Sequence, residues 1–173
     1  MSNPASIHIR SLQTQDLQNL SSFYQKLPED VVRRFQPHAF DLPALQNIYG
    51  SHYRYQGIIA LQNEQIIGYA VVYLGHFDHD LDRMHHHGIQ PNHQTDSQFA
   101  PAVDPAFHGQ GIGQQLFAFA KDELQRKGIQ RIFLWGGVQA DNHQAIRYYE
   151  KLGFTQIGSF DYHGWNHDMV YQS

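Results

Sequence analysis

Apolar residues in the first fifty positions recur every three or four residues, which is the spacing of an amphipathic helix. In a helix that begins near Thr14 or Asp16, one apolar side would consist of Leu17, Leu20, Phe23, Tyr24 and Leu27. Pro28 and Pro43 favour the starts of two further helical segments, because proline is tolerated in a first turn. Residues 7–10 precede these helices and predict a short strand.

From residue 57 onward the pattern changes to continuous apolar runs, which are typical of buried strands. Two such runs, 57–61 and 65–74, flank Asn63-Glu64 and predict a hairpin. Residues 75–97 are polar and rich in His and Asp, which predicts a loop. Further along, the sequence predicts strands at residues 98–103 and 131–136 and a helix at residues 141–152. Residues 154–171 predict a final hairpin that turns near His163-Gly164. This mixed order indicates an α/β (α+β) domain of three layers.

Pro101 conflicts with the predicted strand 98–103, because proline cannot donate a hydrogen bond to a neighbouring strand. A bulge at residues 100–102 would remove the conflict. A strand that begins late, after the proline, would remove it as well, and both alternatives stay open here.

The composition suits one folded domain of 173 residues and 20.0 kDa, since 41% of the residues are hydrophobic. The chain contains no cysteine, which excludes disulfides, zinc-thiolate sites and a cysteine nucleophile. Its formal charge of −4 argues against nucleic acid as a partner and leaves room for a cationic one. The sequence shows no signal segment and no apolar run of membrane length, so we expect a cytoplasmic protein without a membrane partner. Assembly into a homodimer stays open.

The segment from Val103 to Gly113 carries the most informative pattern, Val-Asp-Pro-Ala-Phe-His-Gly-Gln-Gly-Ile-Gly. It joins the predicted strand 98–103 to a predicted helix that runs through Leu116, Phe117, Ala120 and Leu124. The first N–H groups of a helix are unpaired and lie at the positive end of its dipole, so a glycine-rich turn at this point can bind phosphate. A P-loop is excluded because no Gly-Lys-Ser or Gly-Lys-Thr occurs, and the dinucleotide fingerprint is excluded because Gln114 stands where its third glycine belongs.

This segment resembles the cofactor signature of the GNAT acetyltransferase superfamily, whose members bind the pyrophosphate of acetyl-CoA on such a loop. A second segment, Asn142 to Phe154, is similar to the later family pattern Asn-x-x-Ala-x-x-x-Tyr-x-x-x-Gly-Phe. The two segments stand in the family's order, and the match is close over residues 97–160. His108 departs from the pattern, because the family usually has Arg or Gln there. Since backbone N–H groups do most of the cofactor binding, His108 would weaken or alter one side-chain contact without abolishing that binding.

The resemblance implies one GNAT-like domain over residues 1–173, with helices on both faces of a mixed, mostly antiparallel sheet that splays open between two central parallel strands. It implies acetyl-CoA as co-substrate and an amine as acceptor. It also assigns polarisation of the thioester carbonyl to backbone near Val103, and protonation of the leaving thiolate to Tyr149. The residues implied to bind the cofactor are Val103, His108, Gly109, Gln110, Gly111, Ile112, Gly113, Asn142 and Ala145.

Helix geometry agrees with this role for Tyr149, since Asn142, Ala145 and Tyr149 are spaced three or four residues apart and share one side of a helix. Tyr148 would point about a quarter turn away. The alternative is that Tyr149 is a core aromatic residue without a catalytic role. Asn142 also has a second interpretation, because it or Asp141 can cap the helix.

The general base is not identified, because residues 98–103 hold none of the carboxylates that many relatives place on this strand. Candidates elsewhere, each of which is more simply a solvated loop residue, are His76, Asp78, Asp96, Asp161 and His163. A water relay is equally compatible. The histidines between positions 76 and 93 suit zinc or nickel, but adjacent histidines rarely converge on one ion, so no metal site is expected.

The sequence therefore predicts an acyltransferase, namely an acetyl-CoA-dependent N-acetyltransferase that moves the acetyl group directly to a primary amine. A small molecule is the favoured acceptor. Two alternatives remain. One is a protein lysine or N-terminal acetyltransferase. The other is a non-catalytic acyl-CoA-binding or sensing module, which the missing strand carboxylate and His108 keep open.

Overall fold

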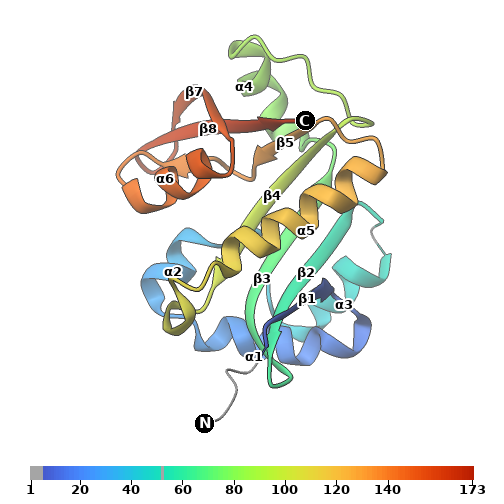
Figure 1. The fold of residues 1–173 in the computed structure, drawn as a ribbon. Coiled ribbons are helices and arrows are strands. Elements are labelled where there is room, and N and C mark those ends of the chain that lie inside the picture. The colour runs from blue at the N-terminus through green and yellow to red at the C-terminus, as the bar shows by residue number, and fades with distance from the viewer. Residues whose placement is uncertain (1–5, 52) are drawn as a thin grey trace. The chain divides into compact units, whose positions relative to one another are not determined.

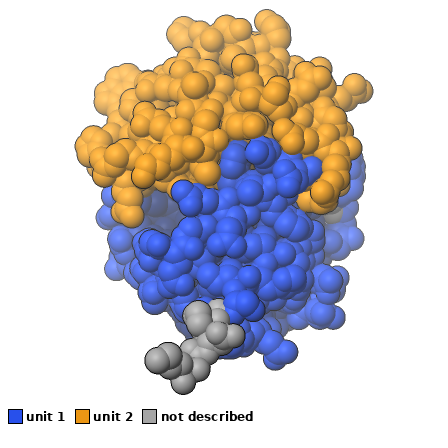
Figure 2. Space-filling model, viewed as in Figure 1, with its two compact units in different colours: residues 1–72, 100–122 blue, residues 73–99, 123–173 orange. Residues whose placement is uncertain are grey.

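The computed structural model describes residues 6–51 and 53–173, which group into two compact units (Figure 2). Unit 1 holds the residues up to Val72 together with Ala100–Asp122, and unit 2 holds Tyr73–Phe99 together with Glu123–Ser173. Three elements continue from one unit into the other: β3 (Gln65–Leu74), β4 (Asp96–Val103) and α5 (Ile112–Arg126).

Unit 1 contains three successive strands and the helices between the first two of them (Figure 1). Besides its parts of β3, β4 and α5, its elements are β1 (His8–Ser11), η1 (Thr14–Asp16), α1 (Leu17–Lys26), α2 (Glu29–Arg34), α3 (Leu42–Ser51), β2 (Tyr55–Gln62) and η3 (Pro105–Phe107). β1 pairs antiparallel with β2. β2 and β3 meet at Asn63 and Glu64, whose φ angles of 49° and 63° are those of a tight hairpin turn. The predicted hairpin and the predicted helices after Thr14, Pro28 and Pro43 are thus confirmed.

Both faces of β3 are covered within unit 1. Gly68 faces α5, because a Cβ placed on this glycine would lie 3.1 Å from the side chain of Ile112. Tyr69 points to the opposite face, since side chains alternate along a strand. Its ring is fully buried against Phe40, at 5.8 Å between centroids, and Tyr24 of α1 stacks on Phe40 at 3.8 Å. This is the three-layer order that the sequence predicts.

Unit 2 holds the remaining strands and two helices. Its elements are η2 (Asp78–Asp80), α4 (Leu81–His86), the start of β4, β5 (Arg131–Leu134), β6 (Val138–Gln139), α6 (His143–Lys151), β7 (Thr155–Asp161) and β8 (Trp165–Gln172). β8 pairs antiparallel with β5, β6 and β7. The β7–β8 hairpin turns at His163 and Gly164, whose φ angles are 51° and 108°, as the sequence predicts. The short strand β6 was not predicted.

β4 and β5 form the parallel pair that was predicted for the centre of the sheet. Asp96 lies opposite Arg131, and the register continues to Phe99 opposite Leu134. The carbonyl of Phe99 then accepts the N–H of Trp135 at 3.0 Å. β5 pairs with only the first half of β4, residues 96–99. The second half, residues 100–103, belongs to unit 1. In the described residues, eight strands pair mostly antiparallel around this parallel pair, which confirms the predicted mixed sheet.

The prediction of a loop over residues 75–97 is wrong. The segment contains η2 and α4, and its side chains reach the core of unit 2. Met84 of α4 is buried in one cluster with Phe133 and Val170. His87 lies so close to the backbone of β7 that a Cβ on Gly158 would overlap its ring. The polarity of the segment is misleading, because Asp80, Arg83 and Asp96 are paired with partners inside the unit.

Pro101 lies within a continuous strand. β4 runs from Asp96 through Pro101 to Val103, so the alternative of a strand that begins after the proline is wrong. The proline follows Phe99, where the ladder with β5 ends, and its missing N–H therefore interrupts no hydrogen bond to β5. The bulge at residues 100–102 stays a prediction.

Candidate active site

The glycine-rich segment leads from β4 through η3 into α5, within unit 1. The backbone N–H of Asp104 donates to the carbonyl of Ile67 at 2.9 Å, which fixes the end of β4 against β3. The carboxylate of Asp104 accepts the N–H of Ala106 at 2.9 Å and caps η3. The helical bonds of α5 then begin where the N–H of Gln115 donates to the carbonyl of Gly111 at 3.0 Å. At a helix start of this kind, the first N–H groups point outward and can bind an anion.

Gly109 and Gly111 shape the turn before the helix. Their φ angles of 78° and 72° lie in the left-handed region that side chains rarely enter. Among the described residues, a Cβ on Gly109 would meet no atom within 4 Å, and one on Gly111 would meet only the amide oxygen of Gln114 at 3.3 Å. The glycines therefore serve the backbone conformation of the turn rather than close packing. The open space beside them is what an incoming phosphate requires.

His108 turns back to the end of β4. Its Nε2 lies 3.2 Å from the carbonyl oxygen of Val103, so Nε2 carries a proton and donates it to that oxygen. The contact ties the first residue of the glycine turn to the strand end. Two of the predicted site residues, Val103 and His108, are thus brought together.

The remaining residues of the predicted cradle differ in exposure. Ile112 is buried against Gly68 of β3, and this packing fixes the start of α5. Gly113 is half-buried, and Gln110 is exposed beside the two glycines. Side-chain packing thus holds the helix in place and leaves the turn itself at the surface of unit 1.

The second predicted group of site residues lies on α6, in unit 2. Asn142 precedes the helix, and its side-chain oxygen accepts the N–H of Ala145 at 3.2 Å. The capping interpretation of Asn142 is therefore confirmed, and its contact with a cofactor stays a prediction. Ala145 lies one turn before Tyr149 and on the same side of α6.

Tyr149 is held by aromatic contacts. Its ring lies 5.5 Å from that of Phe154 and 4.9 Å from that of Tyr148. Burial raises the pKa of the Tyr149 hydroxyl above its ordinary value, and burial does the same for Tyr148. Within residues 6–51 and 53–173, no protein group shares a hydrogen bond with the Tyr149 hydroxyl. The hydroxyl therefore keeps its proton at neutral pH and has it available for a ligand.

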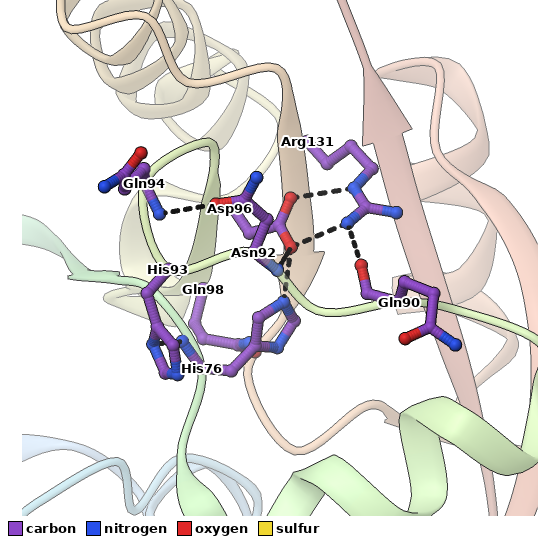
Figure 3. A network of polar contacts seen from close by, with 8 residues as sticks. All are labelled: His76, Gln90, Asn92, His93, Gln94, Asp96, Gln98 and Arg131. Carbon is purple, nitrogen blue, oxygen red and sulfur yellow. Dashed lines mark hydrogen bonds and ion pairs between the residues drawn. The ribbon is translucent and has the colours of Figure 1, made fainter.

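A buried polar network occupies the start of β4 and β5 in unit 2 (Figure 3). The carboxylate of Asp96 lies 2.7 Å from Nε2 of His76 and 2.7 Å from Nε of Arg131. It also accepts the backbone N–H of Asn92 at 2.7 Å. The amide nitrogen of Gln98 lies 3.1 Å from Nδ1 of His76, so Nδ1 accepts and Nε2 donates to Asp96.

The network removes two of the general-base candidates. Burial alone would raise the pKa of Asp96, but the hydrogen bonds from His76, Arg131 and the N–H of Asn92 outweigh it, and the pKa lies below its ordinary value. A carboxylate in that state is a poor proton acceptor. Both ring nitrogens of His76 are occupied as well.

The other candidates for the base, Asp78, Asp161 and His163, are exposed. Unit 1 contains a histidine that the sequence analysis did not single out. Nδ1 of His38 donates to the carbonyl of Ala39 at 2.8 Å, so its Nε2 accepts from the Tyr69 hydroxyl at 2.9 Å. Burial lowers the pKa of His38 below its ordinary value.

Several histidines of residues 75–97 take part in contacts with protein groups. His76 bonds to Asp96, and His87 lies 2.9 Å from Asp168, which also accepts from Arg83 at 2.8 Å. In the part of the chain that the structure describes, no three His, Asp or Glu side chains gather in a way that could hold a metal ion. None of the helices described there is long and apolar enough to cross a membrane.

Comparison with known proteins identifies the family. The profile of the acetyltransferase (GNAT) family matches residues 20–154, which is more than half of the chain. The chain therefore belongs to the GNAT acetyltransferase family, and the predicted membership is confirmed.

Solved structures of acetyltransferases share the fold over nearly the whole chain. The GNAT domain of S. lividans PAT superposes with a TM-score of 0.75 at 18% identity, covering 96% of this chain and 90% of that chain. The aminoglycoside acetyltransferase AAC(6')-Ib in complex with coenzyme A gives a TM-score of 0.72 at 21% identity, covering 96% of this chain and 95% of that chain. At such identities the likeness establishes the fold.

Curated relatives match over shorter stretches. The ribosomal protein bS18-alanine N-acetyltransferase of Salmonella typhimurium is 43% identical over 58 residues, which cover 34% of this chain and 38% of the relative. The mycothiol acetyltransferase of Streptosporangium roseum is 34% identical over 86 residues, which cover 50% of this chain and 22% of the relative. The chain thus spans less than two fifths of the length of these two relatives.

Proposed function

We propose that residues 1–173 act as a single acetyl-CoA-dependent N-acetyltransferase domain, which transfers the acetyl group directly to the primary amine of a small molecule. The observation that carries the proposal is the turn at Gly109 and Gly111, where a left-handed backbone leaves open space in front of a helix start. Family membership supports the use of acetyl-CoA. The relatives named above act on a ribosomal protein, on mycothiol and on aminoglycosides, so the family accepts acceptors of several kinds.

The proposed reaction follows from the chemistry of a thioester. The neutral amine attacks the acetyl carbonyl carbon, the C–S bond breaks, and an amide and the CoA thiolate form. The backbone N–H groups of the cradle, from His108 to Gly113, bind the pyrophosphate, and backbone near Val103 stabilises the charge on the carbonyl oxygen. Tyr149 donates its proton to the thiolate. The amine loses its proton to water, because the described residues offer no carboxylate on β4 beyond the bound Asp96.

Amine-dependent release of free CoA thiol tests the function. The protein is mixed with acetyl-CoA and with each member of a panel of primary amines, and a thiol-reactive dye follows the released thiol. Because the chain contains no cysteine, the dye has no protein background. We expect release with at least one small amine. Tight CoA binding without release for any amine would favour the alternative of a non-catalytic acyl-CoA-binding module.

N-terminal acetylation of a protein is the second candidate function. The 43% identity to the bS18-alanine N-acetyltransferase over 58 residues favours it. A peptide that begins with alanine is the matching acceptor in the same thiol assay. A kcat/KM for this peptide that exceeds that of every small amine would replace the small-molecule proposal.

Replacing Gly111 with valine is expected to weaken acetyl-CoA binding at least tenfold. A β-branched side chain is strained at a φ of 72°, and it would fill the space beside the helix start. Calorimetric titration of the folded variant with acetyl-CoA measures the effect.

Gly128→Val is the matched control for this substitution. Gly128 has a φ of 80° and, among the described residues, no atom within 4 Å of its Cβ position, but it lies in the turn after α5. The control should lose a comparable amount of stability and keep its affinity for acetyl-CoA. Unchanged affinity in Gly111→Val would remove the pyrophosphate from this loop.

A further inference from the structure

Three polar side chains of unit 2 meet on one face of the β7–β8 hairpin and take no part in the proposed reaction (Figure 1). The hydroxyl oxygen of Ser159 lies 2.9 Å from Nδ1 of His167, which stands opposite it in the register of the two strands. The side-chain amide of Gln156 donates to the same hydroxyl oxygen at 3.1 Å. Ser159 is exposed and His167 is half-buried, so a small molecule in solution can reach the hydroxyl. We call Ser159, His167 and Gln156 the serine–histidine cluster.

The hydrogen bonds fix the direction in which the Ser159 hydroxyl donates. The amide nitrogen of Gln156 also lies 3.1 Å from Nδ1 of His167. Because an amide nitrogen only donates, Nδ1 is an acceptor, and Nε2 carries the ring proton. Nδ1 therefore accepts from the hydroxyl of Ser159 as well. A serine hydroxyl that donates to the unprotonated nitrogen of an imidazole has the arrangement of a nucleophile beside its general base.

An irregularity of β7 brings Gln156 to this face of the hairpin. Gln156 and Ser159 are three residues apart, and in a regular strand their side chains would point to opposite faces. The register with β8 shifts between Gln156 and Gly158, which adds one residue to β7 at this point. Gln156 thereby pairs with Met169, on the same face of β8 as His167. Bulges of this kind re-aim a side chain, often next to an active site.

The backbone of Ser159 supplies a hydrogen-bond donor next to the hydroxyl. The carbonyl of Trp165 accepts from the N–H of Ala140, so the backbone groups of Trp165 point away from β7. Those of His167, two residues further along β8, do the same. Ser159 is opposite His167, so its own N–H points to the outer edge of β7, which in the described residues pairs only with β8. A donor in this position can stabilise an oxyanion on a carbon that bonds to Oγ.

Neighbouring side chains on the same face indicate the class of substrate. Trp165 lies two residues before His167 and therefore shares its face, where it is 64% exposed. Its indole is an apolar surface beside the imidazole. Asp161 lies opposite Trp165 and is exposed, and its carboxylate repels a negatively charged molecule. These surroundings favour a neutral ester with an apolar aryl or alkyl part.

We propose that Ser159 is the nucleophile of an esterase activity, with His167 as its general base and Trp165 as the surface that binds the apolar part of a neutral ester. Oγ attacks the carbonyl carbon while Nδ1 takes the hydroxyl proton. The bond from this carbon to the leaving oxygen then breaks, and the imidazolium returns the proton to that oxygen, which departs as an alcohol. Water attacks the acyl-serine with Nδ1 again as base, which releases the carboxylic acid and restores Ser159. The activity is separate from the proposed acetyl transfer and does not depend on it.

Diisopropyl fluorophosphate tests the nucleophile, because it reacts with activated serines: the Oγ–P bond forms, and fluoride leaves. The full chain is incubated with the reagent, and peptide mass spectrometry gives the labelled residue. Ser173 is the internal control, since it is exposed and its hydroxyl donates to the carbonyl of Gln130 at 3.1 Å. We expect Ser159 to be labelled at least about 100-fold faster than Ser173 in the folded protein, and equally slowly in urea. Equal labelling of the two serines in the folded protein, or labelling of neither, would overturn the proposal.

Two variants separate the nucleophile from the base. His167→Gln should lower the rate of labelling at Ser159 about 100-fold in protein with an unaltered melting temperature, and His167→Asn replaces it if it does not fold. Ser159→Ala should hydrolyse p-nitrophenyl acetate at least about tenfold more slowly than the wild type. The residual rate comes from the other imidazoles of a chain with 13 histidines. Equal rates of ester hydrolysis in the wild type and Ser159→Ala would contradict the proposal.

Trp165→Ala tests the binding surface. The variant should raise KM for p-nitrophenyl acetate about fivefold and leave kcat within about twofold, because the indole contacts the ester and does no chemistry. An unchanged KM would overturn the assignment of Trp165.

The thiol-release assay on Ser159→Ala shows whether the two activities are separate. Loss of ester hydrolysis together with wild-type release of CoA thiol is the expected result. Loss of both would make Ser159 part of acetyl transfer and would overturn the proposal of a second activity. If the wild type hydrolyses esters through Ser159 and no amine releases CoA thiol, the serine–histidine cluster stands and the N-acetyltransferase proposal falls.

Discussion

Replacing Tyr149 with phenylalanine is expected to lower kcat for acetyl transfer about 100-fold and to leave the affinity for acetyl-CoA nearly unchanged. The substitution removes only the hydroxyl, and the ring keeps its contact with Phe154. Because burial raises the pKa of Tyr149, the hydroxyl is protonated at neutral pH and can supply the proton that the leaving thiolate needs. Steady-state kinetics with an acceptor from the thiol-release panel and calorimetric titration with acetyl-CoA measure the two effects.

Tyr148→Phe is the matched control, since it removes the same group from the neighbouring residue of α6. Burial also raises the pKa of Tyr148, and its side chain points about a quarter turn away from that of Tyr149 on the helix. The control should change kcat by no more than about twofold. Equal small effects from both substitutions would assign protonation of the thiolate to water. A loss of thermal stability in Tyr149→Phe, without a specific loss of rate, would make Tyr149 a core residue only.

Local signals in the sequence were sufficient for the glycine turn before α5 and for α6. The turn at Gly109 and Gly111 depends on φ angles that glycine adopts readily, and its position between a strand and a helix can be predicted from the apolar pattern. Asn142 caps α6 through a contact three residues along the chain, to Ala145. In both cases the interacting groups are neighbours in the sequence, so a single stretch of residues contains the whole pattern.

The segment 75–97 shows why polarity alone is a poor predictor of a loop. Its charged residues find partners far along the chain: Arg83 and His87 both reach Asp168, more than eighty residues away. Nothing near those residues in the sequence indicates such a partner. An observable hint was Met84, whose apolar side chain stands among polar neighbours and is buried.

The relation between His38 and Tyr69 could not have been predicted for the same reason. His38 lies in the connection between α2 and α3, and Tyr69 lies in β3, so only the tertiary structure brings the imidazole to the hydroxyl. The contact between the rings of Phe77 and Trp135 likewise joins residues that are far apart in the sequence. Residues that act through long-range contacts carry no local spacing that sequence analysis can use.

Replacing Asp96 with asparagine is expected to lower the free energy of unfolding by about 3 kcal/mol. The carboxylate is fully buried and accepts from His76 and Arg131. The asparagine amide would turn a donor toward one of these donors and would leave the guanidinium without its counter-charge. The side chain of Arg131 is 22% exposed, and its contact with water reduces the loss of stability. Urea denaturation of both proteins at neutral pH measures the difference, and Arg131→Gln provides a milder variant if Asp96→Asn does not fold.

The acid side of the stability curve gives an independent readout of the same carboxylate. Since the pKa of Asp96 is lower in the folded protein than the value of about 3.9 expected for an unfolded chain, its contribution is complete above that pH and is lost as the pH falls through the folded pKa. The wild type should therefore lose stability below about pH 4 more steeply than Asp96→Asn. Glu123→Gln, which breaks the exposed ion pair with Arg126, is the control and should change the free energy of unfolding by less than about 0.5 kcal/mol. If Asp96→Asn cost no more than this control, the network would not stabilise unit 2.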